Sequence, residues 1–352
     1  VILVTTKRGK EGHSAINVRA KFGLNYFHDN YTFLGAADYL YWMRMSYKRA
    51  ASYGATNLNS LSGVQPYGTG NIYFNKDGSP ADGNKVNQAN WSTMKYTDDL
   101  AFLLNEGWQT MIDPVYGDKL IFKEFMLEDV NINSPAFSQD YTIDFQGGND
   151  KGSYYSSLGY NNSEGNATNN WYKRFTWTFN GDYKIKPWLT SSSSINFSHN
   201  TWYGLVGNTD VAHYFSRVFT VPPTFRGTNP DGEWLIGNRG TGDANVLAYM
   251  DAQHRDNNTD KFTMTQAFTI HILKNLDLKF SGSWYYQDTK YEYFNEDYRT
   301  GVNGWNRDRY TYDSYERNLN QTYNIVGTYN TTIKKHGINA MAGFEYFVSQ
   351  SK

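Results

Sequence analysis

The sequence predicts an all-β fold: an antiparallel transmembrane β-barrel, present in part as about nine strands, with long extracellular loops and one short helix near 36–51. First, apolar residues or glycine take every second position from Phe175 to Tyr183, which gives a strand one apolar and one polar face. Second, aromatic residues make up 17% of a chain whose mean hydropathy is only -0.68. A barrel explains both observations, because only alternate residues face lipid. Third, short turns alternate with long loops, as in outer-membrane barrels.

The composition excludes several classes of protein. The 352 residues contain no run of about 18 apolar residues, which rules out a transmembrane helix but not a barrel. The net charge of -1 and the lack of a basic stripe argue against nucleic acid as a partner. Because the chain has no cysteine, disulfides, zinc–cysteine sites and thiol catalysis are excluded, and the composition fits an oxidising cell envelope.

The first residues form a segment of their own. Residues 1–6 predict a buried strand, which the charged and glycine-rich residues 7–12 end. No initiator methionine or signal peptide precedes this strand, so we expect a fragment without its N-terminal part. Alternation from Ile16 to Tyr26 then predicts the first strand of the barrel.

The period of the pattern changes at Leu34. Apolar residues from Ala36 to Ala50 recur at helical spacing, which predicts the short helix near 36–51. Arg44, Lys48 and Arg49 are expected on its opposite, polar face. A loop rich in glycine, asparagine and serine should follow to about residue 90, and an irregular stretch to about residue 139.

Eight further strands follow in quick order. They are expected at 141–145, 154–161, 172–184, 189–197, 262–272, 276–286, 323–333 and 338–348. Short turns fall at 148–152, 184–187, 274–275 and 334–337, and polar loops at 162–170, 202–260 and 295–312. An odd number of strands, the last unpaired at Lys352, does not close a bacterial barrel. We therefore expect a fragment at both ends, which does not fold alone.

An ordered set of motifs runs along the whole chain. It comprises VILVTTKRGK at 1–10, AADYL at 36–40, YTIDFQGG at 141–148, SYYSSLGY at 153–160, EG at 164–165, YKRF at 172–175 and PWL at 187–189. In this order the motifs resemble the SusC/RagA-type TonB-dependent (TonB-linked) outer-membrane transporters of Bacteroidetes. The resemblance implies that residues 1–12 are the C-terminal strand of the plug domain. It implies that residues 13–352 are the N-terminal part of the TonB-dependent receptor β-barrel.

The resemblance also implies a function. It suggests TonB-dependent active import of a bulky nutrient, an oligosaccharide or otherwise a peptide, across the bacterial outer membrane. The implied partners are a SusD-like surface lipoprotein, TonB (through the missing N-terminal part), outer-membrane lipid and the glycan or peptide ligand. A multi-pass barrel in the cell outer membrane that is not an enzyme and has no cofactor is expected.

Other classes of protein stay open at this point. The main alternative is a soluble or surface carbohydrate-binding β-protein without transport, whose apolar faces should be richer in branched aliphatic residues. A secreted glycosidase needs paired carboxylates, and Glu292, Glu296 and Asp297 sit in a polar region without an apolar pocket. A simple porin lacks the plug segment at 1–6.

Candidate site residues fall into three groups. Aromatic side chains of the long loops are candidates for ligand contact, because aromatic faces stack on sugar rings: Trp202, Tyr203, Trp234, Trp305 and Tyr310. Polar residues on the lumenal face are candidates for plug contact: Arg19, Lys21, Arg174, Asn180 and Asp182. Aromatic residues near predicted strand ends are candidates for the membrane girdle: Tyr183, Trp188, Trp284 and Tyr286. No catalytic residue stands out, and the scattered histidines predict no metal site.

Overall fold

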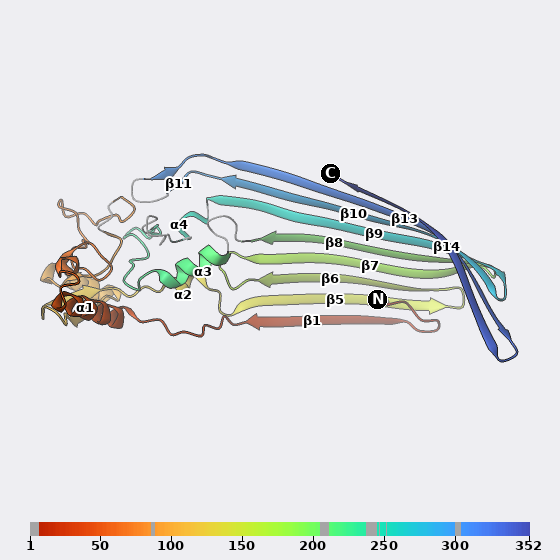
Figure 1. Cartoon of the computed structure of the whole chain (residues 1–352), viewed down its shortest axis with the longest axis horizontal. Coiled ribbons are helices and arrows are strands. Elements are labelled where there is room, and N and C mark those ends of the chain that lie inside the picture. Colours follow the sequence, from red (N-terminus) through yellow and green to blue (C-terminus); the bar gives the residue numbers. More distant parts are fainter. Residues whose placement is uncertain are drawn as a thin grey trace.

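A nine-stranded antiparallel sheet dominates the computed structural model, which describes residues 7–85, 89–204, 211–236, 245, 247–250, 252–299 and 304–352. The strands are β1 (Ala15–Asn25), β5 (Ala136–Asn149), β6 (Gly152–Glu164), β7 (Trp171–Lys186), β8 (Leu189–Tyr203), β9 (Gln253–Leu273), β10 (Leu276–Asn295), β13 (Thr311–Ile333) and β14 (His336–Ser351). They follow one another in chain order from the β1 edge to the β14 edge (Figure 1). This confirms the predicted all-β class and the nine strands.

The two ends of the sheet differ. Turns of two residues join β5 to β6, β7 to β8, β9 to β10 and β13 to β14 at one end. The connections at the other end are long and carry the helices (Figure 1). We call these the short-turn end and the long-loop end, and they match the asymmetry that the sequence predicts.

The register gives the sheet an apolar and a polar face. Phe175, Trp177 and Phe179 on β7 share one face with their partners on β8, whereas Asn180 and Asp182 share the other face with serines. The apolar side chains stay open to the surroundings, as Phe344 shows at 67% exposure. An exposed apolar face of this extent marks contact with lipid or with another protein.

A separate unit lies beyond the long-loop end (Figure 1). It contains α1 (Ala36–Ser52), the 3-10 helices η1 (Asn59–Ser62) and η3 (Asp98–Glu106), and a small sheet of β2 (Met94–Lys95), β4 (Lys119–Phe122) and β3 (Gln109–Ile112). Its core includes Leu100, Leu103, Trp108 and Ile121. The predicted helix is confirmed, but the loop and irregular stretch expected to residue 139 contain a packed unit.

Arg44 does not lie on a solvated helix face as expected, because its side chain is fully buried. Its Nε and Nη2 atoms donate to the two carboxylate oxygens of Asp113 at 2.9 and 2.5 Å. Its Nη1 donates to the backbone oxygens of Leu61 and Tyr67. A buried guanidinium is tolerated only with such complete pairing. The ion pair between Arg44 and Asp113 therefore connects α1 to the turn between β3 and β4.

Short elements cover the long-loop end of the large sheet. They are α2 (Leu127–Asn131), α3 (Val211–Thr220), α4 (Leu247–Met250), β11 (Tyr298–Arg299) and β12 (Trp305–Asn306). Tyr214 and Val218 of α3 pack with Ala167, Ile236 and Met250 in a cluster at this end. Within the described ranges, no helix combines the length and the apolar character needed to cross a membrane.

Several strands extend beyond their predicted ends. Because β8 continues to Tyr203, the expectation that Trp202 and Tyr203 lie in a loop is wrong. β9, β10 and β13 reach 21, 20 and 23 residues. β9 therefore takes residues 253–260 of the segment expected as a loop, and β10 and β13 also include residues 287–294 and 313–322, beyond their predicted ends. The outward residues of these extensions are mostly polar. The sequence there no longer alternates between apolar and polar residues, so alternation does not predict a strand.

Candidate functional site

A groove of about 750 Å³ opens at the long-loop end of β8, β9, β10 and β13. We call it the mouth groove. Its lining residues are Trp202, Gly204, Arg255, Asn257, Tyr291, Glu292, Tyr293, Tyr310, Tyr312, Ser314 and Glu316. The strand partners Asn257 and Tyr291 belong to the polar face, which is the lumenal face in a barrel.

A second groove of about 410 Å³ continues from the mouth groove along the same face. This lower groove is lined by Tyr172, Asn200, Trp202, Thr259, Lys261, Gln287, Thr289, Tyr291 and Glu316. Trp202, Tyr291 and Glu316 line both grooves, so the two form one continuous strip. The Trp202 and Tyr291 rings meet edge to face, with centroids 5.8 Å apart.

Aromatic faces, amides and charges of both signs converge on this strip. The Arg255 guanidinium lies 5.3 and 5.2 Å from the ring centroids of Tyr203 and Tyr293. Lys261 and Glu316 bring an ammonium and a carboxylate that form no ion pair within the described part of the chain. Such a surface suits a ligand that presents both apolar and charged groups.

The lumenal face also holds residues 7–12, which cross β5, β6 and β7. The Asn180 side chain donates to the Lys7 carbonyl oxygen at 2.9 Å, and Arg8 forms an ion pair with Asp182. Gly9 lies so close to the sheet that a Cβ atom there would stand 2.3 Å from the Tyr154 carbonyl oxygen. Residues 1–6, expected as the end of the plug, lie outside the described residues.

The other lumenal candidates lie farther from this segment. Arg174 faces Asn161 and Asn200 across its neighbouring strands, and Arg19 and Lys21 lie on the exposed edge strand β1. On the same lumenal face, the Asn17 side-chain amide of β1 donates a hydrogen bond of 2.8 Å to the Asp144 carboxylate of β5. Asn180 and Asp182 are therefore the candidates that touch residues 7–12.

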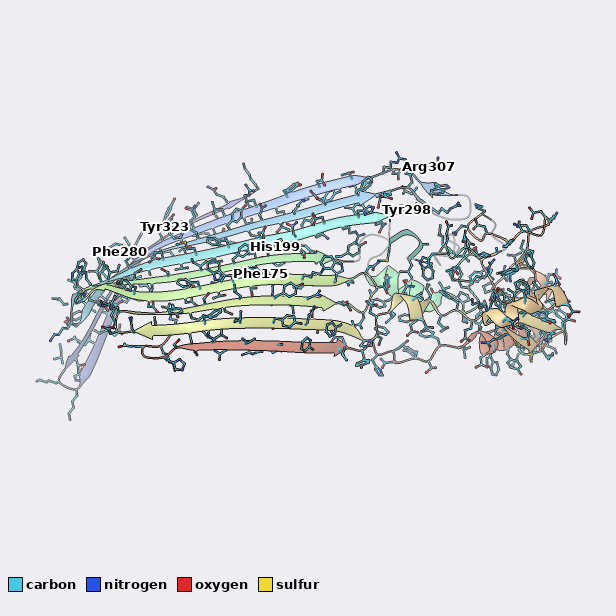
Figure 2. All side chains as sticks on the ribbon, turned by 180° about the vertical axis from the view of Figure 1, so that it is seen from behind. Phe175, His199, Phe280, Tyr298, Arg307 and Tyr323 are labelled. Atoms are coloured by element: carbon cyan, nitrogen blue, oxygen red, sulfur yellow. The ribbon has the colours of Figure 1, made fainter. Side chains whose placement is uncertain are left out.

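The five ligand-contact candidates are not all in one place. Trp202 and Tyr310 line the mouth groove, and Tyr203 packs behind it against Arg255. Trp234 packs near Phe125, and its carbonyl oxygen accepts from Asn84. The Arg299 and Arg307 guanidinium groups lie 4.8 and 5.7 Å from the centroid of the Trp305 ring, and Figure 2 shows Arg307 at the long-loop end of the sheet. Trp234 and Trp305 therefore lie away from both grooves.

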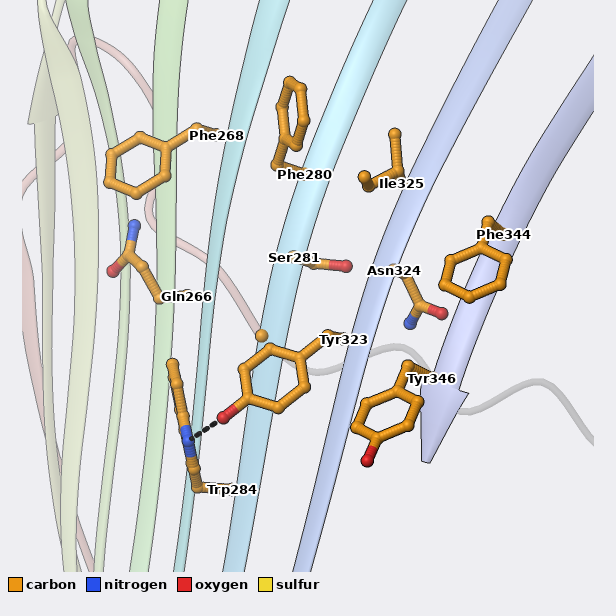
Figure 3. A pocket seen from close by; sticks show the side chains of 11 residues that line it. Gln266, Phe268, Phe280, Ser281, Trp284, Tyr323, Asn324, Ile325, Phe344 and Tyr346 are labelled. Carbon is orange, nitrogen blue, oxygen red and sulfur yellow. Dashed lines mark hydrogen bonds between the residues drawn. The ribbon is translucent and has the colours of Figure 1, made fainter. Parts of the chain in front are cut away.

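The girdle candidates lie at two levels of the apolar face. Tyr183 and Trp188 stand beside the turn between β7 and β8, at 54% and 53% exposure. Trp284 and Tyr286 are not near a strand end as expected, because β10 continues to Asn295. The Trp284 indole donates to the Tyr323 hydroxyl at 3.1 Å (Figure 3). Both rings border a shallow depression of about 380 Å³ on the apolar face.

The apolar face changes character directly beyond Tyr286. Along β10 the outward residues from Leu276 to Tyr286 are apolar, aromatic or glycine, and they span eleven residues. The next outward residue, Asp288, pairs with Arg317 at 3.0 Å, and Lys290 pairs with Glu292 at 2.7 Å. A membrane-spanning strand needs about 9–11 residues, so the apolar band has the right height.

Sequence reasoning missed several groove residues, among them Tyr291, Tyr293, Tyr312 and Glu316. The one signal lies on the lumenal side, where Tyr291 and Tyr293 alternate, because the outward residues directly beyond Tyr286 are charged and no longer indicate a strand. In the part of the chain that the structure describes, no three histidine, aspartate or glutamate side chains gather at a metal site.

The fold is similar to that of solved transporters. No protein-family model matches the sequence, and no curated protein matches it. The RagAB peptide importer matches in its open-open state (16% identity, TM-score 0.67) and in its closed-closed state (15%, 0.65), each over 98% of this chain and 36% of that chain. A RagAB peptide transporter structure matches at 15% and 0.63 over 98% and 37%. This chain therefore has their fold over little more than a third of their length.

Proposed function

We propose that this chain belongs to a SusC/RagA-type TonB-dependent transporter that imports a bulky nutrient across the bacterial outer membrane. The observation that carries the proposal is the eleven-residue apolar band of β10, with charged pairs directly beyond it and a polar opposite face. A soluble sheet protein would cover such a face with a second layer. A bilayer covers it instead, and the protein is an outer-membrane barrel rather than an enzyme.

The segment at 7–12 distinguishes a gated transporter from an open porin. We assign residues 1–12 to the end of a plug domain and residues 13–352 to the first part of the barrel. The contacts of Asn180 and Asp182 with Lys7 and Arg8 support this assignment, because they hold the segment against the lumenal wall. A plug that blocks the lumen requires energy to move, and TonB is the proposed source.

The long-loop end is the proposed extracellular side. Barrels of this kind have short periplasmic turns and longer extracellular loops. The unit around α1 then stands outside the cell, where a SusD-like lipoprotein is the proposed partner over the mouth groove. The groove opens at this end, so a ligand delivered from outside meets Tyr310 and Tyr312 before it reaches Trp202.

We propose an oligopeptide as the substrate. The strip combines Arg255, Lys261 and Glu316 with aromatic rings, which matches the charged and apolar groups of peptides. The structural neighbours are named as peptide importers, which supports the same choice. An oligosaccharide is the second candidate, because the half-buried Trp202 ring and the exposed Tyr291 ring also suit sugar rings.

Uptake by intact cells tests this function. Cells that produce the full-length protein should accumulate labelled oligopeptides, and cells without it or without TonB should not. Labelled oligosaccharides are tested in parallel, and uptake of these alone would favour the second candidate. Equal uptake of either ligand with and without the protein would contradict the proposal.

A further inference from the structure

Lysines crowd the short-turn end of the sheet. Within three residues of the four turns (147–154, 184–191, 271–278 and 331–338) lie six lysines against two aspartates, on a chain whose net charge is -1. The lysines are Lys151, Lys184, Lys186, Lys274, Lys334 and Lys335. All six are exposed, and they form no ion pair with any residue that the structure describes. This end is therefore strongly cationic.

Apolar residues lie directly beside these charges. Ile185 precedes Lys186, Leu273 precedes Lys274, and Ile333 precedes Lys334, and all three apolar side chains are exposed. Trp188, in the same turn as Lys186, is also exposed. Exposed apolar side chains and ammonium groups are thus neighbours in the sequence. Acyl chains and charged headgroups are neighbours in the same way at a bilayer surface.

The turn conformation does not explain the lysines. Lys334 has a φ of 57°, in the left-handed region that asparagine or glycine adopts with less strain. Two-residue hairpin turns strongly prefer those residue types. Lys334 therefore supplies charge at a conformational cost, which points to a role outside the turn.

We infer that five of these lysines, all except Lys184, which shares the lumenal face with Asp182, dock on the anionic phospholipid headgroups of the periplasmic leaflet. The inference rests on the proposed function, since it requires that the sheet spans the outer membrane. Charge complementarity selects this occupant, because phosphate is the anionic group that a bilayer presents at that depth. At the opposite end of the outward face acids outnumber bases on β9, β10 and β13: Asp256, Asp260, Asp288, Glu292 and Asp313 against Lys290 and Arg317. Each lysine should raise lipid affinity about fivefold, equivalent to about 1 kcal/mol.

Native mass spectrometry of the full-length protein in detergent tests the inference. The protein is equilibrated with equal amounts of phosphatidylglycerol and phosphatidylethanolamine, and the lipids retained are counted. The test variant combines Lys186→Gln, Lys274→Gln and Lys335→Gln. The control combines Lys48→Gln, Arg49→Gln and Lys76→Gln, which removes three exposed cations from the extracellular unit. Heat-modifiability on gels shows that each variant retains a folded barrel.

The wild type and the control should retain phosphatidylglycerol at least tenfold over phosphatidylethanolamine, and the test variant should lose most of this preference. High salt should abolish the wild-type preference without any mutation, so the test does not depend on the variant folding. A wild type without preference, or one that salt leaves unchanged, overturns the inference alone. A protein that leaves the membrane fraction on alkaline washing overturns the proposed function as well.

Discussion

The indole of Trp202 on β8 and the phenol of Tyr291 on β10 meet edge to face, 5.8 Å between centroids, across the intervening strand β9. The register explains the contact, because Asn257 of β9 pairs with both residues. The two rings come from strands two places apart in the sheet, and they form one aromatic pair where the mouth groove and the lower groove join. This aromatic pair is the centre of the proposed binding strip.

Removal of the indole should weaken ligand binding. Trp202→Ala is expected to lower affinity for the proposed oligopeptide ligand about tenfold, roughly 1.4 kcal/mol, because stacking area and the ring pair are both lost. Calorimetric titration of the purified protein measures the change. Trp305→Ala is the matched control, since Trp305 is exposed at the same end but lies outside both grooves. Equal losses in both variants would argue against the groove as the site.

The buried pair of Arg44 and Asp113 should hold the extracellular unit together. Asp113→Ala leaves a buried guanidinium without its carboxylate, which is expected to destabilise the unit by about 3–5 kcal/mol. Faster limited proteolysis around α1 should report this loss. Asp118→Ala breaks the exposed pair with Lys95 and should cost at most about 1 kcal/mol. Similar protease resistance in the two variants would show that the buried pair is dispensable.

Gly9 should be essential for the fit of residues 7–12 on the lumenal wall. Gly9→Ala places a methyl group against the Tyr154 and Gly147 carbonyl oxygens, so the segment has to move away from the sheet. Trypsin should then cleave at Lys7, Arg8 and Lys10 several times faster than in the wild type. Gly337→Ala adds a methyl group in open space and should leave the cleavage unchanged. Unaltered cleavage in Gly9→Ala would contradict the close packing.

Alkaline pH should loosen the extracellular unit through Tyr39. Burial, with a smaller contribution from Tyr47, raises the pKa of Tyr39 from 10.0 to about 12. Because the folded state holds this proton more tightly, its contribution to stability is complete below pH 10 and is lost as pH rises toward 12. Proteolysis of the unit should therefore accelerate across this window. Tyr39→Phe should flatten that part of the profile, and an unchanged profile would exclude Tyr39 as the cause.

Alternation along the strands was sufficient to predict the nine strands and their short turns. The outward residues from Leu276 to Tyr286 carry a clear period of two, as a strand with one apolar and one polar face does. Beyond Tyr286 the outward positions become charged, so the pattern no longer distinguishes strand from loop. This is why Tyr291 and Tyr293 were missed.

The packed unit beyond the strands was not predictable from period alone. Arg44 shares its side of α1 with the buried Ala36 and Leu40, and its charge is buried because it pairs with Asp113, 69 residues away. Trp234 and Trp305 show that the position of a ligand-contact candidate is likewise not predictable from its local sequence. An aromatic residue in a polar loop has the same local sequence whether it packs near Phe125, stands between two arginines or lines a groove.

Cysteine labelling tests the central claim, that the apolar face of the sheet meets lipid, most directly. The chain has no cysteine, so single variants report one position each. In membranes from cells that produce the full-length protein, Phe280→Cys and Ile325→Cys should resist a water-soluble maleimide and react with a membrane-soluble one. Glu292→Cys, on the same outward face beyond the band, should react with the water-soluble reagent. Equal labelling of all three positions by the water-soluble reagent would contradict a membrane-spanning sheet.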